Sequence, residues 1–293
     1  MKPKINMIAA MLLFGSIGLF VRNIDLSSSQ VALVRGVVGS MTLLAVSMMG
    51  RKKFSFSAIR ANLLLLIASG AAIGFNWIFL FESYKYTTIS IATLSYYFAP
   101  VFVLFLSPFL LKERLSVQKI ICSAAAVAGM FLIMNVAEGN AGSDPMRGIG
   151  YGLAAAALYA SVILMNKFMK GMSGMETTLV QLIMASLVLL PYVLVTEKIA
   201  WTSLGGRSLV FVLTVGILHT GIGYYLYFSS MQKLSGQTVA ALSYIDPVSA
   251  IAMSTLFLGE TMSLLQLAGG VMILGATFFS DRQKSLRSER KTK

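Results

Sequence analysis

Ten apolar runs, separated by short polar stretches, make up almost the whole chain. Most are about 20 residues long, the length that an α-helix needs to cross the hydrocarbon core of a bilayer. The pattern therefore predicts an all-α integral membrane protein with ten transmembrane helices. The predicted spans are residues 5–21, 28–49, 61–83, 88–109, 117–137, 150–168, 176–196, 208–230, 237–258 and 263–280.

The second five runs repeat the first five with an offset of 145 to 148 residues. For example, GFNWIFLFES at 74–83 aligns with GIGYYLYFSS at 221–230, and a Lys and then Leu-Ser-Tyr follow each segment. Because each half has an odd number of spans, the two copies should face opposite ways across the membrane, as in many secondary transporters. The predicted organisation is a first five-helix repeat at 1–137, an extracytoplasmic linker at 138–149, a second five-helix repeat at 150–280 and a basic cytoplasmic tail at 281–293.

Each half also carries a proline inside a membrane-length run. A glutamate follows each proline by thirteen positions, in the pairs Pro100/Glu113 and Pro247/Glu260. Because proline has no N–H, the carbonyls of Tyr96 and Ser243, four residues back, lose their helical partner. Inside a membrane a free carbonyl is tolerated only where protein, water or a ligand satisfies it. Two such prolines at matching positions predict a site at the interface between the repeats.

Composition and charge fit this picture. The chain is 57% hydrophobic and 12% charged, against about 25% charged residues in an average soluble domain. With the N-terminus inside, 18 of the 24 Lys and Arg lie on the cytoplasmic side and 5 outside, with Arg35 within a span. This asymmetry predicts a multi-pass protein of the cell membrane with both termini in the cytoplasm. Topology and attraction to anionic lipid account for the net charge of +13, so no nucleic-acid partner is expected.

These features resemble the EamA family of the drug/metabolite transporter superfamily over nearly the whole chain. Each repeat closes with a proline, an apolar helix, a glutamate and a glycine-bearing last helix: Pro100, Glu113 and Gly129, then Pro247, Leu258-Gly259-Glu260, and Gly269, Gly270 and Gly275. The first repeat has Leu-Lys-Glu in place of Leu-Gly-Glu, a mild departure. The resemblance implies a basket-like bundle around a central cavity lined mainly by spans 1, 3, 4, 6, 8 and 9. It also implies movement of small organic molecules, often outward.

Asp246 is the one acid that the predicted spans place near the bilayer midplane. A carboxylate inside the membrane is costly and is therefore a functional candidate by default. Because burial favours the neutral form of a carboxyl group, Asp246 could load and release a coupling proton. It could instead hold the amine of a substrate, or make a structural hydrogen bond to the backbone that Pro247 frees.

Three further polar residues are candidates. His219, the single histidine, lies mid-span and could relay protons, although a buried neutral histidine with hydrogen-bond partners is the commoner case. Ser16 is the serine that could pair with His219 in an intramembrane hydrolase, but no motif supports that pairing. Arg35 could hold an anionic group at the cavity mouth. Since the resemblance makes its span peripheral, we favour a side chain that extends to the outer surface.

A group of aromatic and amide side chains lies within about two turns of the midplane, too deep for an interfacial aromatic belt. Tyrosine offers an apolar ring and a hydroxyl group, a combination that suits amphipathic ligands. The group comprises Asn76, Trp77, Tyr96, Tyr97, Tyr159, Tyr224, Tyr225 and Tyr244. Nearer the span ends, Glu82 is expected to pair with Lys85. Glu113 and Glu260 lie on opposite sides of the membrane and are expected to be structural anchors or gate elements.

The function that these residues favour is secondary transport, with export preferred, of small organic metabolites such as amino acids and amphipathic or aromatic compounds. Uptake by the same fold, an intramembrane enzyme and a non-transporting membrane partner stay open. The chain has no GxxxxGK[ST] phosphate loop, which argues against ATP hydrolysis. Phosphorylated cargo would need several buried cations. One His and the lone Cys122, far apart, predict no metal site, no cofactor and no disulfide. The pattern leaves monomer and homodimer undecided.

Overall fold

The structure is a computed structural model that describes residues 2–50, 54–111, 117–135, 143–197, 205–231, 233–234 and 236–289. Within these ranges the regular secondary structure is helical throughout. Glu113, residues 138–142 of the predicted linker and the last four residues of the tail lie outside the described residues. The elements are α1 (Lys2–Val21), α2 (Ser28–Met49), α3 (Phe56–Ala61), α4 (Leu63–Tyr86), α5 (Ile89–Tyr96), α6 (Ala99–Leu111), α7 (Val117–Asn135), α8 (Pro145–Asn166), α9 (Gly174–Thr196), α10 (Gly206–Thr214), the π-helix η2 (Val215–Ile222), α11 (Gly223–Met231), α12 (Gly236–Ser243), α13 (Ile245–Leu258) and α14 (Leu264–Glu289).

Seven helical segments of the described chain are long and apolar enough to cross a membrane. They are Lys2–Val21, Ser28–Met49, Leu63–Tyr86, Ile89–Leu110, Pro145–Asn166, Gly174–Thr196 and Gly206–Met231. The other three predicted spans contain shorter apolar helices, at Ile120–Ile133, Ile245–Leu258 and Leu264–Ala276. The all-helical class is therefore confirmed for the described residues, while the full count of ten crossings stays a prediction.

Two of the predicted spans are interrupted near their prolines. The first divides into α5 and α6 at residues 97–98, and Pro100 is the second residue of α6. The second divides into α12 and α13 at residue 244, and Pro247 is the third residue of α13. The first turn of a helix suits proline because its missing N–H would have no helical partner there. Each proline therefore begins a helix rather than continuing one.

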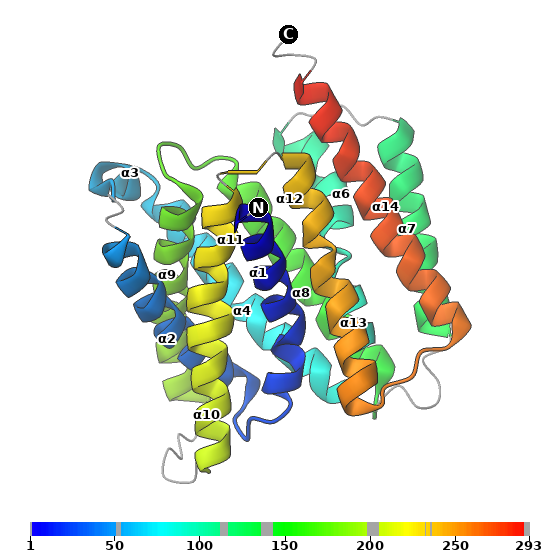
Figure 1. Ribbon diagram of the computed structural model, residues 1–293, viewed down its shortest axis with the longest axis horizontal. Helices are drawn as coiled ribbons and strands as arrows, with labels where there is room; N and C mark the ends of the chain where they lie inside the picture. The colour runs from blue at the N-terminus through cyan, green and yellow to red at the C-terminus, as the bar shows by residue number, and fades with distance from the viewer. Residues whose placement is uncertain are drawn as a thin grey trace.

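The helices form a broad bundle (Figure 1) in which segments of the two halves of the chain lie side by side. Helix α4 packs against α8 and α9, α2 packs against η2 and α9, and α1 packs against α13 and α11. At one edge, α7 packs against α14. Glycine makes this last contact close, because a Cβ added at Gly129 would lie 2.6 Å from the carbonyl oxygen of Gly269. Small residues at such crossings let helices approach in membranes.

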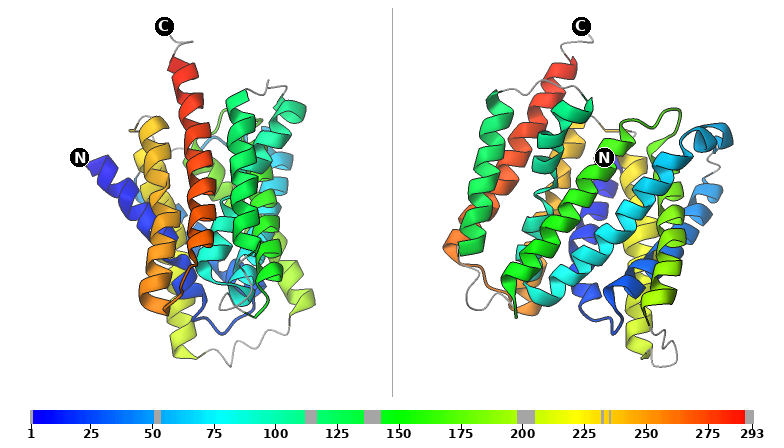
Figure 2. Two further views of the ribbon diagram at one scale, coloured as in Figure 1. Left: turned by 90° about the vertical axis from the view of Figure 1, so that its right-hand side faces the viewer. Right: turned by 180° about the vertical axis from the view of Figure 1, so that it is seen from behind.

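The N-terminal end of α1 and the C-terminal end of α14 point toward the same end of the bundle (Figures 1 and 2). At the opposite end, the connections after α1, α4 and α13 contact one another through Arg22, Thr87 and Glu260. Asn23 accepts a hydrogen bond from Arg207, at the start of α10. Several helices begin at a side-chain cap: Ser27 and Ser173 form capping boxes, and Thr88 and Asp144 also accept from a backbone N–H. Such caps satisfy N–H groups that a helix cannot pair internally.

Candidate functional site

The two interrupted spans meet at Asp246. This residue lies in the first turn of α13, directly before Pro247, and its side chain is half-buried. The hydroxyl group of Tyr97, at the break between α5 and α6, donates a hydrogen bond of 2.7 Å to Asp246 Oδ2. Helix α1 comes close because Gly15 lacks a side chain; a Cβ there would lie 2.6 Å from the Asp246 carbonyl oxygen. The Asp246 carboxylate therefore accepts a hydrogen bond from a side chain, Tyr97, and this bond connects the two helix breaks.

Three tyrosines gather beside this acid. The rings of Tyr96 and Tyr97 are 6.2 Å apart, and those of Tyr96 and Tyr159 are 5.4 Å apart. Tyr159, on α8, exposes 41% of its surface although it lies deep among protein atoms. Asp246, Tyr96 and Tyr97 are likewise partly accessible and deeply placed. A residue that is both accessible and surrounded by protein borders a space inside the bundle. The ring of Tyr224, on α11, packs against Phe14 of α1 at 5.4 Å.

Arg35 lies elsewhere than we expected. It is 5% exposed, so the prediction that its side chain extends to the outer surface is wrong. Its guanidinium carbon lies 4.3 Å from the ring centroid of Trp77 and 5.7 Å from that of Phe81, and Nε donates a 2.8 Å hydrogen bond to the Thr220 hydroxyl oxygen. The faces of aromatic rings attract a cation, which makes this burial less costly.

His219 lies inside the π-helix η2 and is 1% exposed. Its Nε2 is 2.9 Å from Ser16 Oγ, and its Nδ1 is 3.3 Å from the carbonyl oxygen of Thr214. The Thr214 carbonyl can only accept, so Nδ1 carries the proton of the neutral ring. The single Ser16 proton has two acceptors in reach, His219 Nε2 and the Leu13 carbonyl oxygen at 2.8 Å. Phe20 packs edge-to-face against the imidazole at 4.7 Å. The Ser16–His219 pair is therefore formed, with the histidine buried and Ser16 half-buried. Helices of the π type recur at functional sites.

The other candidates contact helices rather than the accessible space. Asn76 is 2% exposed, and its amide donates a 2.6 Å hydrogen bond to the Ala155 carbonyl oxygen on α8. Trp77 is 4% exposed and lies against Arg35. The ring of Tyr244 packs against Phe278 of α14 at 5.5 Å. Asn76 thus joins α4 to α8, and Tyr244 joins the second break to the last helix.

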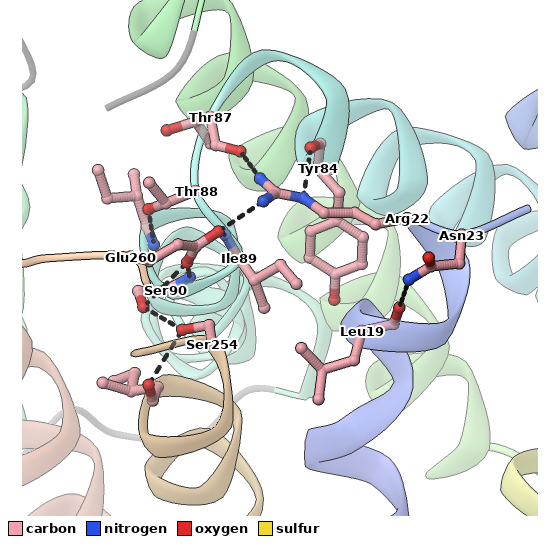
Figure 3. A network of polar contacts seen from close by, with 12 residues as sticks. Leu19, Arg22, Asn23, Tyr84, Thr87, Thr88, Ile89, Ser90, Ser254 and Glu260 are labelled. Atoms are coloured by element: carbon pink, nitrogen blue, oxygen red, sulfur yellow. Dashed lines mark hydrogen bonds and ion pairs between the residues drawn. The ribbon is translucent and has the colours of Figure 1, made fainter. Parts of the chain in front are cut away.

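A polar network at the end of the bundle opposite the termini joins α1, α5 and α13 (Figure 3). Arg22 Nη1 lies 2.7 Å from Glu260 Oε1, and Arg22 also donates to the carbonyl oxygens of Tyr84 and Thr87. The Glu260 carboxylate accepts from the backbone N–H groups of Ile89 and Ser90, the first two residues of α5. A negative charge at a helix N-terminus is stabilising because the unpaired N–H groups and the helix dipole both attract it. We call the set Arg22, Ser90, Ser254 and Glu260 the outer clasp, in which the Ser90 and Ser254 hydroxyl oxygens are 2.8 Å apart.

Sequence reasoning identified Glu260 as an anchor or gate element but missed Arg22, Ser90 and Ser254. A signal for Arg22 was present, since the predicted topology puts it on the same side of the membrane as Glu260. The serines gave no signal, because a hydroxyl in an apolar helix is common. The expected Glu82–Lys85 pair is confirmed, with Lys85 Nζ 2.7 Å from Glu82 Oε1. Among the described residues, no group of three or more His, Cys, Asp or Glu side chains is arranged to hold a metal ion.

An all-helical bundle with membrane-length apolar helices and a partly accessible acid among tyrosines is the arrangement of a multi-pass membrane transporter. The chain belongs to the EamA-like transporter family, whose model matches residues 2–135 and 146–280. A protein of known crystal structure is similar over 98% of both chains, with a TM-score of 0.67 and 18% identity, which shows a shared fold. Membership in this family implies a lipid bilayer around the protein and a small-molecule substrate.

Two relatives illustrate what the chain is similar to. The uncharacterized transporter YxxF of Bacillus subtilis is 32% identical over 275 residues, which cover 92% of this chain and 86% of that protein. A protein of Salmonella typhimurium named probable amino-acid metabolite efflux pump is 26% identical over 232 residues, which cover 75% of this chain and 77% of that protein. The family and these names indicate a transporter rather than an enzyme.

Proposed function

We propose that this chain is a secondary transporter that exports small amino-acid-like or aromatic metabolites by alternating access, coupled to protons or facilitated. One observation carries the proposal: the half-buried Asp246 accepts a hydrogen bond from Tyr97 where two interrupted helices meet, beside the accessible Tyr159. Interrupted helices with a polar site at the break are the usual construction of transporter binding sites. In this proposal Asp246 carries the coupling proton or holds the substrate's amine.

The proposed architecture is ten crossings in two inverted repeats, divided as the sequence predicts. Such a duplication requires each helix contact to recur with the two halves exchanged. Helix α4 packs against α8 and α9, while η2 and α11, at the corresponding place in the second half, pack against α2 and α1. Likewise α1 packs against α13, and α8 packs against α5 and α6. These exchanged contacts support the inverted repeat, and termini at one end of the bundle support an even number of crossings.

The outer clasp is the gate in this proposal. It joins α1, α5 and α13 at the end that the positive-inside rule assigns to the extracytoplasmic side. While Arg22 and Glu260 are paired, these three helices are held together there. Alternating access requires that the pair separate when the site opens outward. Export rather than uptake is proposed because a relative is named as an efflux pump of amino-acid metabolites.

The function is tested by comparing the metabolites of cells with and without the protein, followed by flux assays in proteoliposomes. Compounds that accumulate inside cells lacking the protein are the expected export substrates, and purified protein should move them across vesicle membranes. Imposing a proton gradient of either sign then separates coupled from facilitated transport. If no compound that differs between the cells moves in vesicles, the transport proposal is wrong.

The topology is tested separately with reporter fusions. We expect a fusion at residue 142 to report the extracytoplasmic side and a fusion at the C-terminus to report the cytoplasm, because Lys and Arg strongly favour one side. A fusion after residue 50 provides the matched cytoplasmic control. If residue 142 and the C-terminus report the same compartment, the ten-crossing arrangement is wrong.

A further inference from the structure

Arg35 is a buried cation whose charge no carboxylate of the described residues balances. The ion pairs in that part of the chain are Arg22–Glu260 and Lys85–Glu82. Arg35 Nε donates to the Thr220 hydroxyl, which itself donates to the Val215 carbonyl. The two terminal amino groups of a guanidinium carry four further N–H donors. A buried guanidinium thus meets hydroxyl groups and aromatic rings, which stabilise a cation without neutralising it.

The surroundings of Arg35 hold its side chain in place. Trp77 and Phe81, one turn apart on α4, both lie beside the guanidinium. Gly36, next in the chain, allows α9 to approach, because a Cβ there would lie 2.6 Å from Ser186 Oγ. A charge inside a membrane bundle is expensive and is retained mainly where it has a function. Packing fixes the Arg35 guanidinium in place, and its terminal N–H groups are donors of the kind that bind an anion.

Tyrosines connect Arg35 to the accessible site. Tyr96 and Tyr224 pack against the core cluster that contains Trp77, Phe81 and Tyr84. Tyr84, Tyr96 and Tyr224 therefore lie near the Arg35 guanidinium. Tyr84 and Tyr96 also interact with Asp246. Arg35 and Asp246 therefore have tyrosine neighbours in common, and among the ion pairs of the described residues they form none with each other. Each is left available to the opposite charge of a bound molecule.

We propose that Arg35, with the hydroxyl groups of Tyr96 and Tyr224, forms a subsite for the carboxylate of the substrate, while Asp246 receives its amine. The inference rests on the proposed transport function and narrows it to molecules that carry both charges. A single guanidinium pairs with a carboxylate through two N–H···O bonds and balances its one negative charge. A phosphate monoester carries about −1.5 to −2 at pH 7, which one cation does not balance. The aromatic rings between the two charges fit an apolar or aromatic body. Because Arg35 is almost fully buried, side chains that cover it must move before a substrate can touch the guanidinium.

The test uses four probes that share one aromatic side chain and carry different charges: L-phenylalanine, its methyl ester, its N-acetyl derivative and the N-acetyl methyl ester. The esters lack the anion, and the acetylated compounds lack the cation. Binding of each probe to purified full-length protein is measured by competition with the labelled amino acid. On the wild type we expect the amino acid to bind at least about tenfold more tightly than either singly blocked probe, since each lost charge pair leaves a buried group unpaired.

Two variants test which residue binds the carboxylate of the probe and which binds its amine. Arg35→Gln should bind the amino acid and its methyl ester equally and still prefer both to the acetylated probes; Asp246→Asn should show the converse. Arg207→Gln is the matched control, because Arg207 also lies near an aromatic ring, Phe211, but is exposed at the bundle end. Arg35→Lys keeps the charge and should keep part of the preference for the free carboxylate.

The outcome on the wild type does not depend on how well a variant folds. If the methyl ester binds as well as the amino acid, or if none of the four probes binds, the carboxylate subsite is wrong. The proposed transport function is judged independently, by flux of the compounds found in the metabolite comparison. If the protein transports such compounds but binds the probes equally with and without a free carboxylate, the proposed transport function stands and the carboxylate subsite is wrong.

Discussion

The two interrupted spans have the same construction and different chemistry. Each consists of an eight-residue helix, a short break and a longer helix with proline in its first turn. Before Pro100 the chain has Ala99, which is 2% exposed, whereas before Pro247 it has the half-buried Asp246. The first span contributes the hydroxyl of Tyr97, and the second contributes the carboxylate that accepts from it. A duplicated scaffold thus supplies two similar breaks, and the second alone holds the acid.

The second span also holds the first at two points. Asp246 meets Tyr97 at the C-terminal end of α5, and Glu260, beyond α13, caps the N-terminus of α5 through Ile89 and Ser90. Helix α5 is therefore connected at both ends to polar groups of the other half. Movement of α13 relative to α5 would change the site and the outer clasp together. Such shared contacts couple a site to a gate.

The largest effect is expected for Asp246→Asn, which removes the charge that distinguishes the second break from the first. Asparagine keeps the size and can accept from Tyr97 but carries no charge. Proton-driven flux should fall by at least about tenfold, a change that corresponds to roughly 1.4 kcal/mol. Flux driven by a proton gradient and equilibrium exchange of labelled substrate are measured in the same vesicles.

The two assays separate the proposed roles of Asp246. A proton carrier should lose driven flux and keep exchange, while an amine-binding group should lose both. Glu82→Gln is the control, because Glu82 lies on the exposed part of the chain in a pair with Lys85. Normal driven flux in Asp246→Asn would show that the difference between the two breaks has no functional role.

A smaller effect is expected when the outer clasp is weakened by Glu260→Gln. Glutamine can still accept from the start of α5 but cannot pair with Arg22, whose side chain is 30% exposed. Because solvent partly screens that pair, we expect a loss of about 1–2 kcal/mol in the free energy of unfolding. A cysteine introduced at Ser254 should become more reactive to a thiol reagent that cannot cross the membrane.

The charge-exchanged double variant Arg22→Glu, Glu260→Arg tests whether the pair itself matters. It should restore part of the closed gate but not the cap of α5, since an arginine cannot accept from backbone N–H groups. Cys122 should be replaced by Ala so that the introduced cysteine is the single thiol. Unchanged reactivity in Glu260→Gln would mean that the clasp is a fixed structural contact.

The sequence predicted the helices and their breaks well because both depend on local chemistry. Apolar runs of membrane length mark the helices, and the missing N–H of a proline marks a break whatever the rest of the fold does. The Glu82–Lys85 pair could also be predicted, since residues three apart on a helix are neighbours. These features need no knowledge of which helices are adjacent.

The parts that sequence could not predict depend on helix contacts. Tyr97 and Asp246 were both candidates, but their pairing joins residues 149 positions apart. Arg35 was misplaced because its own helix offers no partner for a buried charge, while Trp77 of α4 does. The π-helical turns around His219 also gave no local signal. Contacts between helices, rather than residue types, determine which candidates share a site.

Replacing either proline by alanine should have a moderate effect that compares the two breaks directly. Alanine restores a backbone N–H, but because both prolines lie in the first turn of a helix, that N–H pairs with a carbonyl one turn back only if the break closes. The free energy of unfolding should therefore stay equal or rise by at most about 1 kcal/mol. Transport should fall severalfold, and more for Pro247→Ala than for Pro100→Ala because Pro247 adjoins the acid. Pro191→Ala, inside α9, is the control. If both variants transport at the wild-type rate, the two prolines shape the helices but have no role in transport.

The smallest effect is expected for Tyr97→Phe, which removes the hydrogen bond between the two breaks. The ring still packs against Tyr96, and Asp246 keeps its charge but loses a 2.7 Å hydrogen bond. Water can replace that donor at a half-buried carboxylate, so the net loss should be about 0.5–1 kcal/mol, or roughly two- to fivefold in driven flux. Tyr192→Phe, whose ring packs against Phe75 on the other side of the bundle, is the matched control. If Tyr97→Phe abolishes driven flux as completely as Asp246→Asn, the hydroxyl group takes part in proton transfer itself. In that case the first break contributes chemistry as well as shape.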